Sequence, residues 1–145
     1  MKLVKTGDLP PDRSYLFATF PHGILSIGPF CAFSTDSCEF EKVFPGLKPS
    51  TVTLKMHFVT PFIRELGLAM GSIPADESIM LKKLSEKGNA LGLVVGGAEE
   101  AFHSKPGEYN ILLERRKGFI RVALRSGASI VPTLLFGEPD VRNIL

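Results

Sequence analysis

Tryptophan is absent from the sequence, and the two cysteines, Cys31 and Cys38, are too few for a disulfide framework or a four-ligand zinc site. The sequence also lacks the Gly-x-Ser-x-Gly turn of serine hydrolases, a phosphate-binding loop and a cysteine pair with metal-ligand spacing. The 17 lysines and arginines nearly balance the 15 aspartates and glutamates, which argues against a nucleic-acid-binding protein. We therefore expect no metal ion and no nucleic acid as a partner.

No secretory leader is expected, because the basic residues at the start are not followed by an apolar core. The longest uncharged run, residues 14–35, is long enough to cross a bilayer, but prolines and glycines interrupt it. This run predicts a buried strand, a turn and a further apolar segment, or a segment that dips into a membrane from one side. With 145 residues, 44% of them hydrophobic, the chain has enough length and apolar content for one domain.

Continuous apolar runs predict buried strands at Tyr15–Phe20, Ala90–Val95 and Ser129–Phe136. The β-branched, alternating residues Thr51–Phe58 predict a further strand. Pro132 indicates that its strand is irregular or lies at an edge, because proline cannot donate a hydrogen bond to a sheet ladder.

Helical spacing of apolar residues predicts helices at Asp76–Lys87 and Arg116–Arg125, and Gly127 is the expected stop of the second. A short helix is predicted at Phe62–Ala69, and Ile24–Phe33 is expected to form a helix or a close-packed loop. Strands separated by helices are typical of an α/β fold.

We therefore predict a single domain over residues 1–145, with a mainly parallel sheet flanked by helices. In such sheets, functional sites gather at the carboxyl ends of the strands. His22 follows Tyr15–Phe20, and Glu100 follows Ala90–Val95, so both residues are candidates for a functional site.

His22 lies between Pro21, which restricts the backbone, and Gly23, which permits the close approach of a substrate. A histidine in such a turn can accept a proton from a hydroxyl nucleophile. The simpler interpretation is a turn histidine that bonds to the backbone. His57 and His103 have no visible partners in the sequence and are expected to be structural or exposed.

Gly96 and Gly97 follow a predicted buried strand, and their amides are candidates to hold an oxyanion or a phosphate. Glu100 is a candidate to orient the His22 imidazole if the two strand ends are adjacent. The alternative is a plain glycine turn into a helix, whose first-turn acids favour the helix dipole.

Arg115, Arg116 and Lys117 open a predicted helix, where cations oppose the helix dipole. This conflict favours an anionic partner, such as the phosphates of a nucleotide-like molecule. The alternative is a solvated basic face.

Several different short motifs are distributed over nearly the whole chain: Tyr15–Gly28, Phe44–Gly46, Val95–Glu100, Arg116–Phe119, Gly127–Ala128, Val131–Pro132 and Phe136–Glu138. In this order and spacing they resemble the type-2 diacylglycerol acyltransferase family, which includes monoacylglycerol and wax-alcohol acyltransferases. The resemblance implies a glycerolipid-acyltransferase-like fold in an enzyme of the endoplasmic reticulum membrane and lipid droplets. Such an enzyme uses acyl-CoA as a co-substrate and needs no further cofactor.

The family motif is usually His-Pro-His-Gly, and here Phe20 replaces the first histidine while Pro21, His22 and Gly23 remain. Family members usually carry an N-terminal membrane hairpin and a further C-terminal region. The sequence therefore resembles the central part of such an enzyme, and we expect a partial domain.

The resemblance implies acyl transfer from acyl-CoA to a neutral lipid hydroxyl, with diacylglycerol as the favoured acceptor and triacylglycerol as the product. His22 would act as the base and Glu100 would orient it. Backbone amides near Gly23, Gly96 or Gly97 are the candidates to bind the oxyanion. Arg116 and Lys117 are the candidates for the CoA phosphates. The alternative is an inactive fragment of the same family that binds acyl-CoA or lipid.

Overall fold

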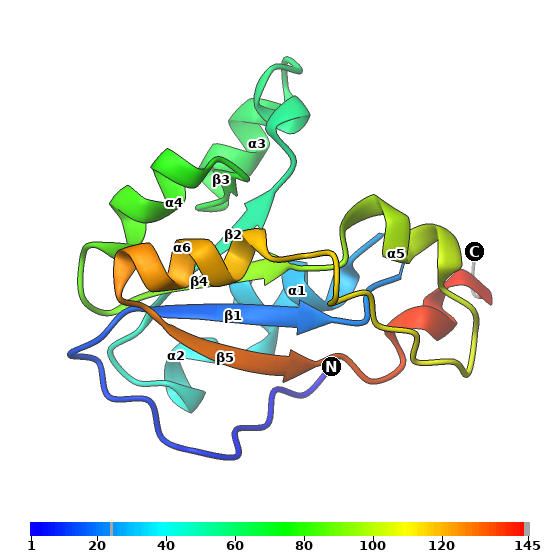
Figure 1. The fold of residues 1–145 in the computed structure, drawn as a ribbon, viewed down its shortest axis with the longest axis horizontal. Coiled ribbons are helices and arrows are strands. Elements are labelled where there is room, and N and C mark those ends of the chain that lie inside the picture. The colour runs from blue at the N-terminus through cyan, green and yellow to red at the C-terminus, as the bar shows by residue number, and fades with distance from the viewer. Residues whose placement is uncertain (24, 144–145) are drawn as a thin grey trace.

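The computed structural model describes residues 1–23 and 25–143 of the chain. Within these residues, five strands form one all-parallel sheet in the order β3-β2-β4-β1-β5 (Figure 1). This arrangement confirms the predicted α/β fold. The strands are β1 (Tyr15–Phe20), β2 (Lys48–Thr53), β3 (Ile73–Pro74), β4 (Asn89–Val94) and β5 (Ser129–Leu134).

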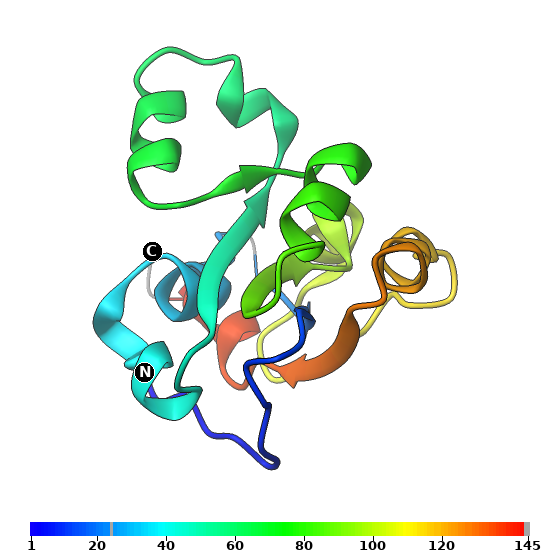
Figure 2. The ribbon, with the colours of Figure 1, turned by 90° about the vertical axis from the view of Figure 1, so that its left-hand side faces the viewer.

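Helices cover both faces of the sheet, with α1 and α2 on one face and α4 and α6 on the other (Figure 2). The α-helices are α1 (Ile27–Phe33), α2 (Phe40–Val43), α3 (Ile63–Ala69), α4 (Glu77–Leu84), α5 (Gly97–His103) and α6 (Gly118–Ser126). Short 3-10 helices are η1 (Asp36–Cys38), η2 (Lys55–Phe58) and η3 (Glu138–Asn143).

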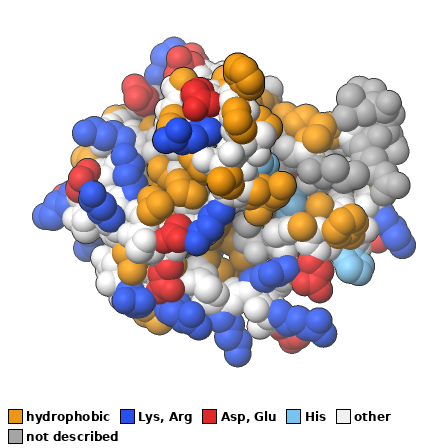
Figure 3. Space-filling model, turned by 90° about the horizontal axis from the view of Figure 1, so that it is seen from above, with side chains coloured by type: hydrophobic (Ala, Val, Ile, Leu, Met, Phe, Trp, Pro, Cys, Tyr) orange, Lys and Arg blue, Asp and Glu red, His pale blue; other side chains and the backbone are white. Residues whose placement is uncertain are grey.

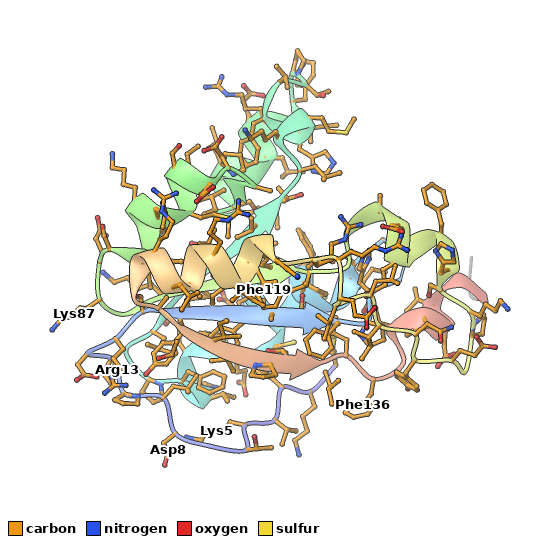
Figure 4. The ribbon with its side chains drawn as sticks, in the orientation of Figure 1. Lys5, Asp8, Arg13, Lys87, Phe119 and Phe136 are labelled. Carbon is orange, nitrogen blue, oxygen red and sulfur yellow. The ribbon has the colours of Figure 1, made fainter. Side chains whose placement is uncertain are left out.

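Strand β1, which lies between β4 and β5, contributes to both halves of the core, because successive side chains on a strand point to opposite faces. Phe17 packs edge-on against Phe33 of α1, with ring centroids 5.1 Å apart, while Leu16 packs on the side of α4 and α6. Gly92 of β4 allows this packing, since a Cβ there would lie 2.4 Å from the Phe33 ring. On the other face, Phe119 of α6 points toward the sheet (Figure 4).

Several element boundaries differ from those predicted. The strand predicted at Thr51–Phe58 is wrong in its second half, because β2 runs over Lys48–Thr53 and the chain then turns into η2. The helix predicted from Arg116 starts only at Gly118, so Arg116 precedes it. The short strand β3 was not predicted, since two residues are too few for a periodic pattern.

Other details of the prediction are confirmed. Gly127 ends α6 with a φ of 72°, in the left-handed region that favours glycine. Strand β5, which contains Pro132, lies at one edge of the sheet. Proline is tolerated there because an edge strand leaves part of its backbone unpaired.

The segment Leu54–Met70, which contains η2 and α3 and is called the α3 arm below, projects from the body of the molecule (Figures 1 and 2). An ion pair between Lys55 and Asp76 ties its base to the start of α4 and lowers the pKa of the Asp76 carboxyl. Its large apolar side chains are mostly exposed, among them Leu54, Met56, Val59, Phe62, Ile63, Leu66 and Leu68. Within the described residues, no helix has the length and apolar character required to span a membrane.

Candidate functional site

The turn Phe20–Gly23, called the His22 turn below, leaves β1 at its carboxyl end (Figure 1). His22 is buried, with 4% of its surface exposed. Its backbone N–H donates to Glu100 Oε1 at 2.9 Å. The structure therefore brings together the two residues that sequence analysis selected, although they lie 78 positions apart.

The His22 ring meets two carbonyl oxygens. Nδ1 lies 2.8 Å from the oxygen of Gly23, and Nε2 lies 2.7 Å from the oxygen of Gly97. Ser26 Oγ lies 3.2 Å from Nδ1. A neutral imidazole has only one N–H, so both carbonyls accept hydrogen bonds at once only from the doubly protonated ring.

Glu100 contacts the backbone of His22 and not its ring, which differs from the expected contact with the imidazole. Its second oxygen, Oε2, accepts from the N–H of Leu112 at 3.0 Å, and only 2% of the residue is exposed. Gly96 makes room for this side chain, since a Cβ there would lie 2.2 Å from Glu100 Cδ. Glu100 thus fixes the His22 turn through the main chain.

A second buried glutamate, Glu138, packs against the His22 turn, and sequence analysis did not select it as a site residue. Glu138 Oε2 accepts from the N–H of Gly28, in the first turn of α1, at 2.8 Å. Its backbone oxygen packs against Gly23, where a Cβ would lie 2.6 Å away. The only sequence signal for this residue was its place in the motif Phe136–Glu138.

The predicted amide groups lie at the start of α5. Gly97 opens α5 with a φ of 62°, and Gly96 precedes it. Within the described part of the chain, the N–H groups of Gly96 and Gly97 have no backbone acceptor. The Gly97 carbonyl is the group that contacts His22, a contact that residue patterns alone cannot reveal.

Arg116 lies beside this turn and is partly buried. Its Nη2 donates to Glu99 Oε2 at 2.8 Å, and its guanidinium would lie 3.9 Å from a Cβ on Gly97. Glu99 thus gives Arg116 an anionic partner within the chain. Arg115 and Lys117 are exposed, and Arg115 Nη1 lies 4.0 Å from Glu99 Oε1.

His22 lines a cavity of about 450 Å³ whose wall is mainly apolar. The cavity extends between the His22 turn, the carboxyl end of β2 and the α3 arm, including helix α3. Viewed from above, hydrophobic side chains gather on this part of the surface (Figure 3). Apolar lining residues include Leu25, Ile27, Phe30, Leu54, Phe58, Ile63, Leu66, Met70 and Leu93.

His57, which was expected to be structural or exposed, also lines this cavity. Its Nδ1 lies 2.8 Å from Thr53 Oγ1 at the end of β2. The only sequence signal was the four-residue spacing of Thr53 and His57. This spacing brings the two side chains together because Lys55–Phe58 forms a 3-10 helix and not a strand.

These features define an α/β protein with a buried histidine and an apolar cavity at the carboxyl ends of its strands. The model of the family described as diacylglycerol acyltransferase matches residues 1–145. Human 2-acylglycerol O-acyltransferase 3 is 46% identical over 143 residues, which cover 97% of this chain and 42% of that protein. The chain belongs to the diacylglycerol acyltransferase family.

Other relatives have different acceptors in their names. Diacylglycerol O-acyltransferase 2 of Danio rerio is 43% identical over 143 residues, covering 97% of this chain and 40% of the relative. Human acyl-CoA wax alcohol acyltransferase 1 is 44% identical over 140 residues, which cover 96% of this chain and 43% of that protein. The chain thus spans about two fifths of the length of these curated relatives. No solved structure matches the chain.

Proposed function

We propose that the chain carries the catalytic residues of an O-acyltransferase, which moves a fatty acyl group from acyl-CoA to the hydroxyl of a neutral lipid. Diacylglycerol is the acceptor that we favour, with triacylglycerol as the product. The observation that carries the proposal is a buried histidine, fixed by a buried carboxylate, on the wall of an apolar cavity. Membership of the family supports it.

The reaction requires one proton transfer and one acyl transfer. His22 takes the proton of the acceptor hydroxyl as its oxygen attacks the thioester carbonyl. The new C–O bond forms, the C–S bond breaks, and the CoA thiolate takes the proton from the imidazolium. A thioester is already activated, so no covalent acyl-enzyme is needed.

The contacts of the His22 ring suggest how the acceptor enters. Nε2 lies 2.7 Å from the Gly97 carbonyl, and this carbonyl occupies one hydrogen-bonding direction of the ring. We infer that the acceptor hydroxyl replaces the Gly97 carbonyl at Nε2. After proton transfer, the Gly23 carbonyl stabilises the imidazolium through Nδ1.

Other groups near His22 are candidates to bind the thioester oxygen and the phosphates of CoA. The N–H groups of Gly96 and Gly97 are candidates to bind the oxyanion, because backbone donors suit the charge that develops on a thioester oxygen. Arg116 and Lys117 are candidates for the CoA phosphates. Lys117 is exposed, whereas Arg116 would have to share its guanidinium with Glu99.

We further propose that the protein works at the membrane of the endoplasmic reticulum and at lipid droplets, as the family resemblance implies. The support is the α3 arm, where Val59 and Phe62 are 80% and 88% exposed and adjoin in sequence the lining residues Phe58 and Ile63. Exposed apolar side chains of this number mark interaction sites. An arm that enters lipid would bring the cavity within reach of an insoluble acceptor.

One observation favours a second candidate, a family fragment that binds acyl-CoA or lipid without catalysis. Both ring nitrogens of His22 face carbonyl oxygens, so neither is free to act as a base in this conformation. Phe20, which stands in place of the usual first histidine of the motif, adds to this alternative.

The test is an acyl-transfer assay on the protein expressed from its complete coding sequence, in detergent micelles with labelled acyl-CoA and diacylglycerol. We expect labelled triacylglycerol, and its loss in His22→Ala. Binding of acyl-CoA with no product from any hydroxyl acceptor would instead establish the second candidate. Full activity of His22→Ala would overturn His22 as the base.

A further inference from the structure

His57 and Thr53 form the second polar site of the cavity. Thr53 is the last residue of β2, and His57 lies one turn later in η2. The Thr53 hydroxyl lies 2.8 Å from His57 Nδ1, which fixes the plane of the ring. Both side chains line the same cavity as His22.

The other hydroxyls on this wall have partners: Ser26 contacts His22, and Thr51 and Ser72 both contact Ser34. Thr51 Oγ1 lies 2.6 Å from Ser34 Oγ, and Ser72 Oγ lies 3.5 Å from the same atom. His57 Nε2, in contrast, has no hydrogen-bond partner among the described residues. The cavity wall thus offers one oriented ring nitrogen among mainly apolar side chains.

Sheet register sets the separation of the two strand ends that precede His22 and His57. Val52 of β2, Leu93 of β4 and Ala18 of β1 lie in one row across the sheet, so β2 and β1 end at the same level with β4 between them. Two strand spacings correspond to about 10 Å. A glycerol backbone with a hydrogen bond of about 3 Å at each end covers such a gap.

We propose that His57, held by Thr53, recognises the glyceride backbone of the acceptor and distinguishes glycerides from long-chain alcohols. In the proposed arrangement Thr53 donates to Nδ1, and Nε2 carries the hydrogen and donates to an ester carbonyl of the glyceride. A glyceride offers such a group beyond its reacting hydroxyl, and a long-chain alcohol does not. This proposal rests on the proposed function, because it assumes that the acceptor hydroxyl lies at His22.

The test compares two acceptors in the same enzyme. The protein expressed from its complete coding sequence receives one acyl-CoA and either diacylglycerol or a long-chain alcohol in micelles, and kcat/KM is measured for each. His57→Leu is expected to lower kcat/KM for diacylglycerol about tenfold, the usual effect of losing one buried hydrogen bond. The alcohol reaction should change less than about twofold, and the glyceride loss should lie mainly in KM.

Two further variants make the result specific. His57→Gln keeps a polar group and should recover part of the glyceride activity. His103→Leu is the matched control, because His103 is an exposed histidine of α5 whose Nδ1 contacts the carbonyl of Glu99, and it should leave both reactions unchanged.

The proposal is overturned if His57→Leu lowers both reactions equally, or if it changes neither. A wild-type protein that transfers to no acceptor would contradict the proposed function instead. Acceptor binding without acyl-CoA then decides the matter, since His57→Leu must weaken diacylglycerol binding more than alcohol binding. Equal binding of each lipid by the wild type and the variant would overturn the proposal in that case as well.

Discussion

The His22 turn and the α3 arm both follow the carboxyl ends of strands, and they are stabilised in opposite ways. The His22 turn is buried and is fixed through its backbone by Glu100, while Glu138 packs against it. The α3 arm has exposed apolar side chains and an ion pair at its base. The comparison indicates that the proposed catalytic turn depends on fixed polar contacts, whereas the proposed lipid-binding arm depends on exposed apolar area and little on precise geometry.

The largest expected effect belongs to the His22 turn. His22→Ala should lower acyl transfer by about two to four orders of magnitude, because that is the usual contribution of a general base. Initial rates at saturating substrates measure it, with protein level and membrane fraction measured in parallel. His103→Ala is the control and should keep full activity. Activity within about twofold of the wild type would remove His22 from the mechanism.

Glu100→Ala should have the next largest effect, because its carboxylate accepts from the N–H groups of both His22 and Leu112. Each hydrogen bond to a charged group contributes about 1.5–3 kcal/mol. We expect a loss of about 3 kcal/mol or more in the free energy of unfolding, with kcat lowered more than KM. Denaturant titration and steady-state kinetics measure the two effects.

Gly96→Ala should reproduce the Glu100→Ala defect without touching the carboxylate, because its Cβ would lie 2.2 Å from Glu100 Cδ. Gly7→Ala, where no atom lies within 4 Å of the added Cβ, is the control. Full activity of Gly96→Ala would show that the enzyme does not require Glu100 at its observed position.

The sequence predicted those parts of the fold that depend on neighbouring residues, and it failed where contacts between distant residues decide the structure. Buried strands such as Tyr15–Phe20 were predicted correctly, because a continuous apolar run is a local signal. The strand at Thr51–Phe58 was predicted too long, since the apolar alternation after Thr53 belongs to exposed residues of the α3 arm. Periodicity cannot separate a buried apolar residue from an exposed one.

The site shows the same limit. Parallel-sheet topology made His22 and Glu100 neighbours, because both follow strands that end at one edge. The bond to the His22 backbone, the Gly97 carbonyl at the ring and the pair of Thr53 with His57 depend on turn conformation. No local pattern encodes these contacts, so only the folded structure reveals them.

Glu138→Ala should have about half the effect of Glu100→Ala on stability, because Glu138 makes one carboxylate bond, to Gly28. The expected loss is about 1.5–3 kcal/mol in the free energy of unfolding. Asp140→Ala is the matched control. Asp140 lies in the same 3-10 helix and its carboxylate accepts from the N–H of Gly107 at 2.7 Å, but it is exposed. Equal losses in the two variants would mean that burial at Glu138 contributes nothing.

Substitutions of exposed apolar residues in the α3 arm should weaken membrane binding and leave the free energy of unfolding unchanged. Val59→Ser combined with Phe62→Ser should weaken binding to neutral-lipid vesicles about tenfold, since it removes apolar area available to lipid. The free energy of unfolding should stay within about 0.5 kcal/mol, as is usual for surface substitutions. Leu124→Ser with Phe102→Ser is the control, because these residues are equally exposed, at 79% and 85%, but lie on α6 and α5. Vesicle flotation that gives equal losses for both pairs would argue against the arm as the lipid-binding segment.

The smallest expected effect is at Lys117, which differs from Arg116 in having no recorded ion-pair partner among the described residues. An exposed cation that meets a phosphate contributes little, because solvent and salt screen the pair. Lys117→Ala should therefore raise the KM for acyl-CoA about two- to threefold at low salt, leave the KM for the acceptor unchanged, and lose its effect near 1 M salt, where the Debye length is about 3 Å. Arg116→Ala should behave differently. It also removes the bond to Glu99 beside Gly97, so part of its effect should lie in kcat and persist at high salt. If both variants acted alike, or only on the acceptor, the CoA phosphates would have to bind elsewhere on the protein.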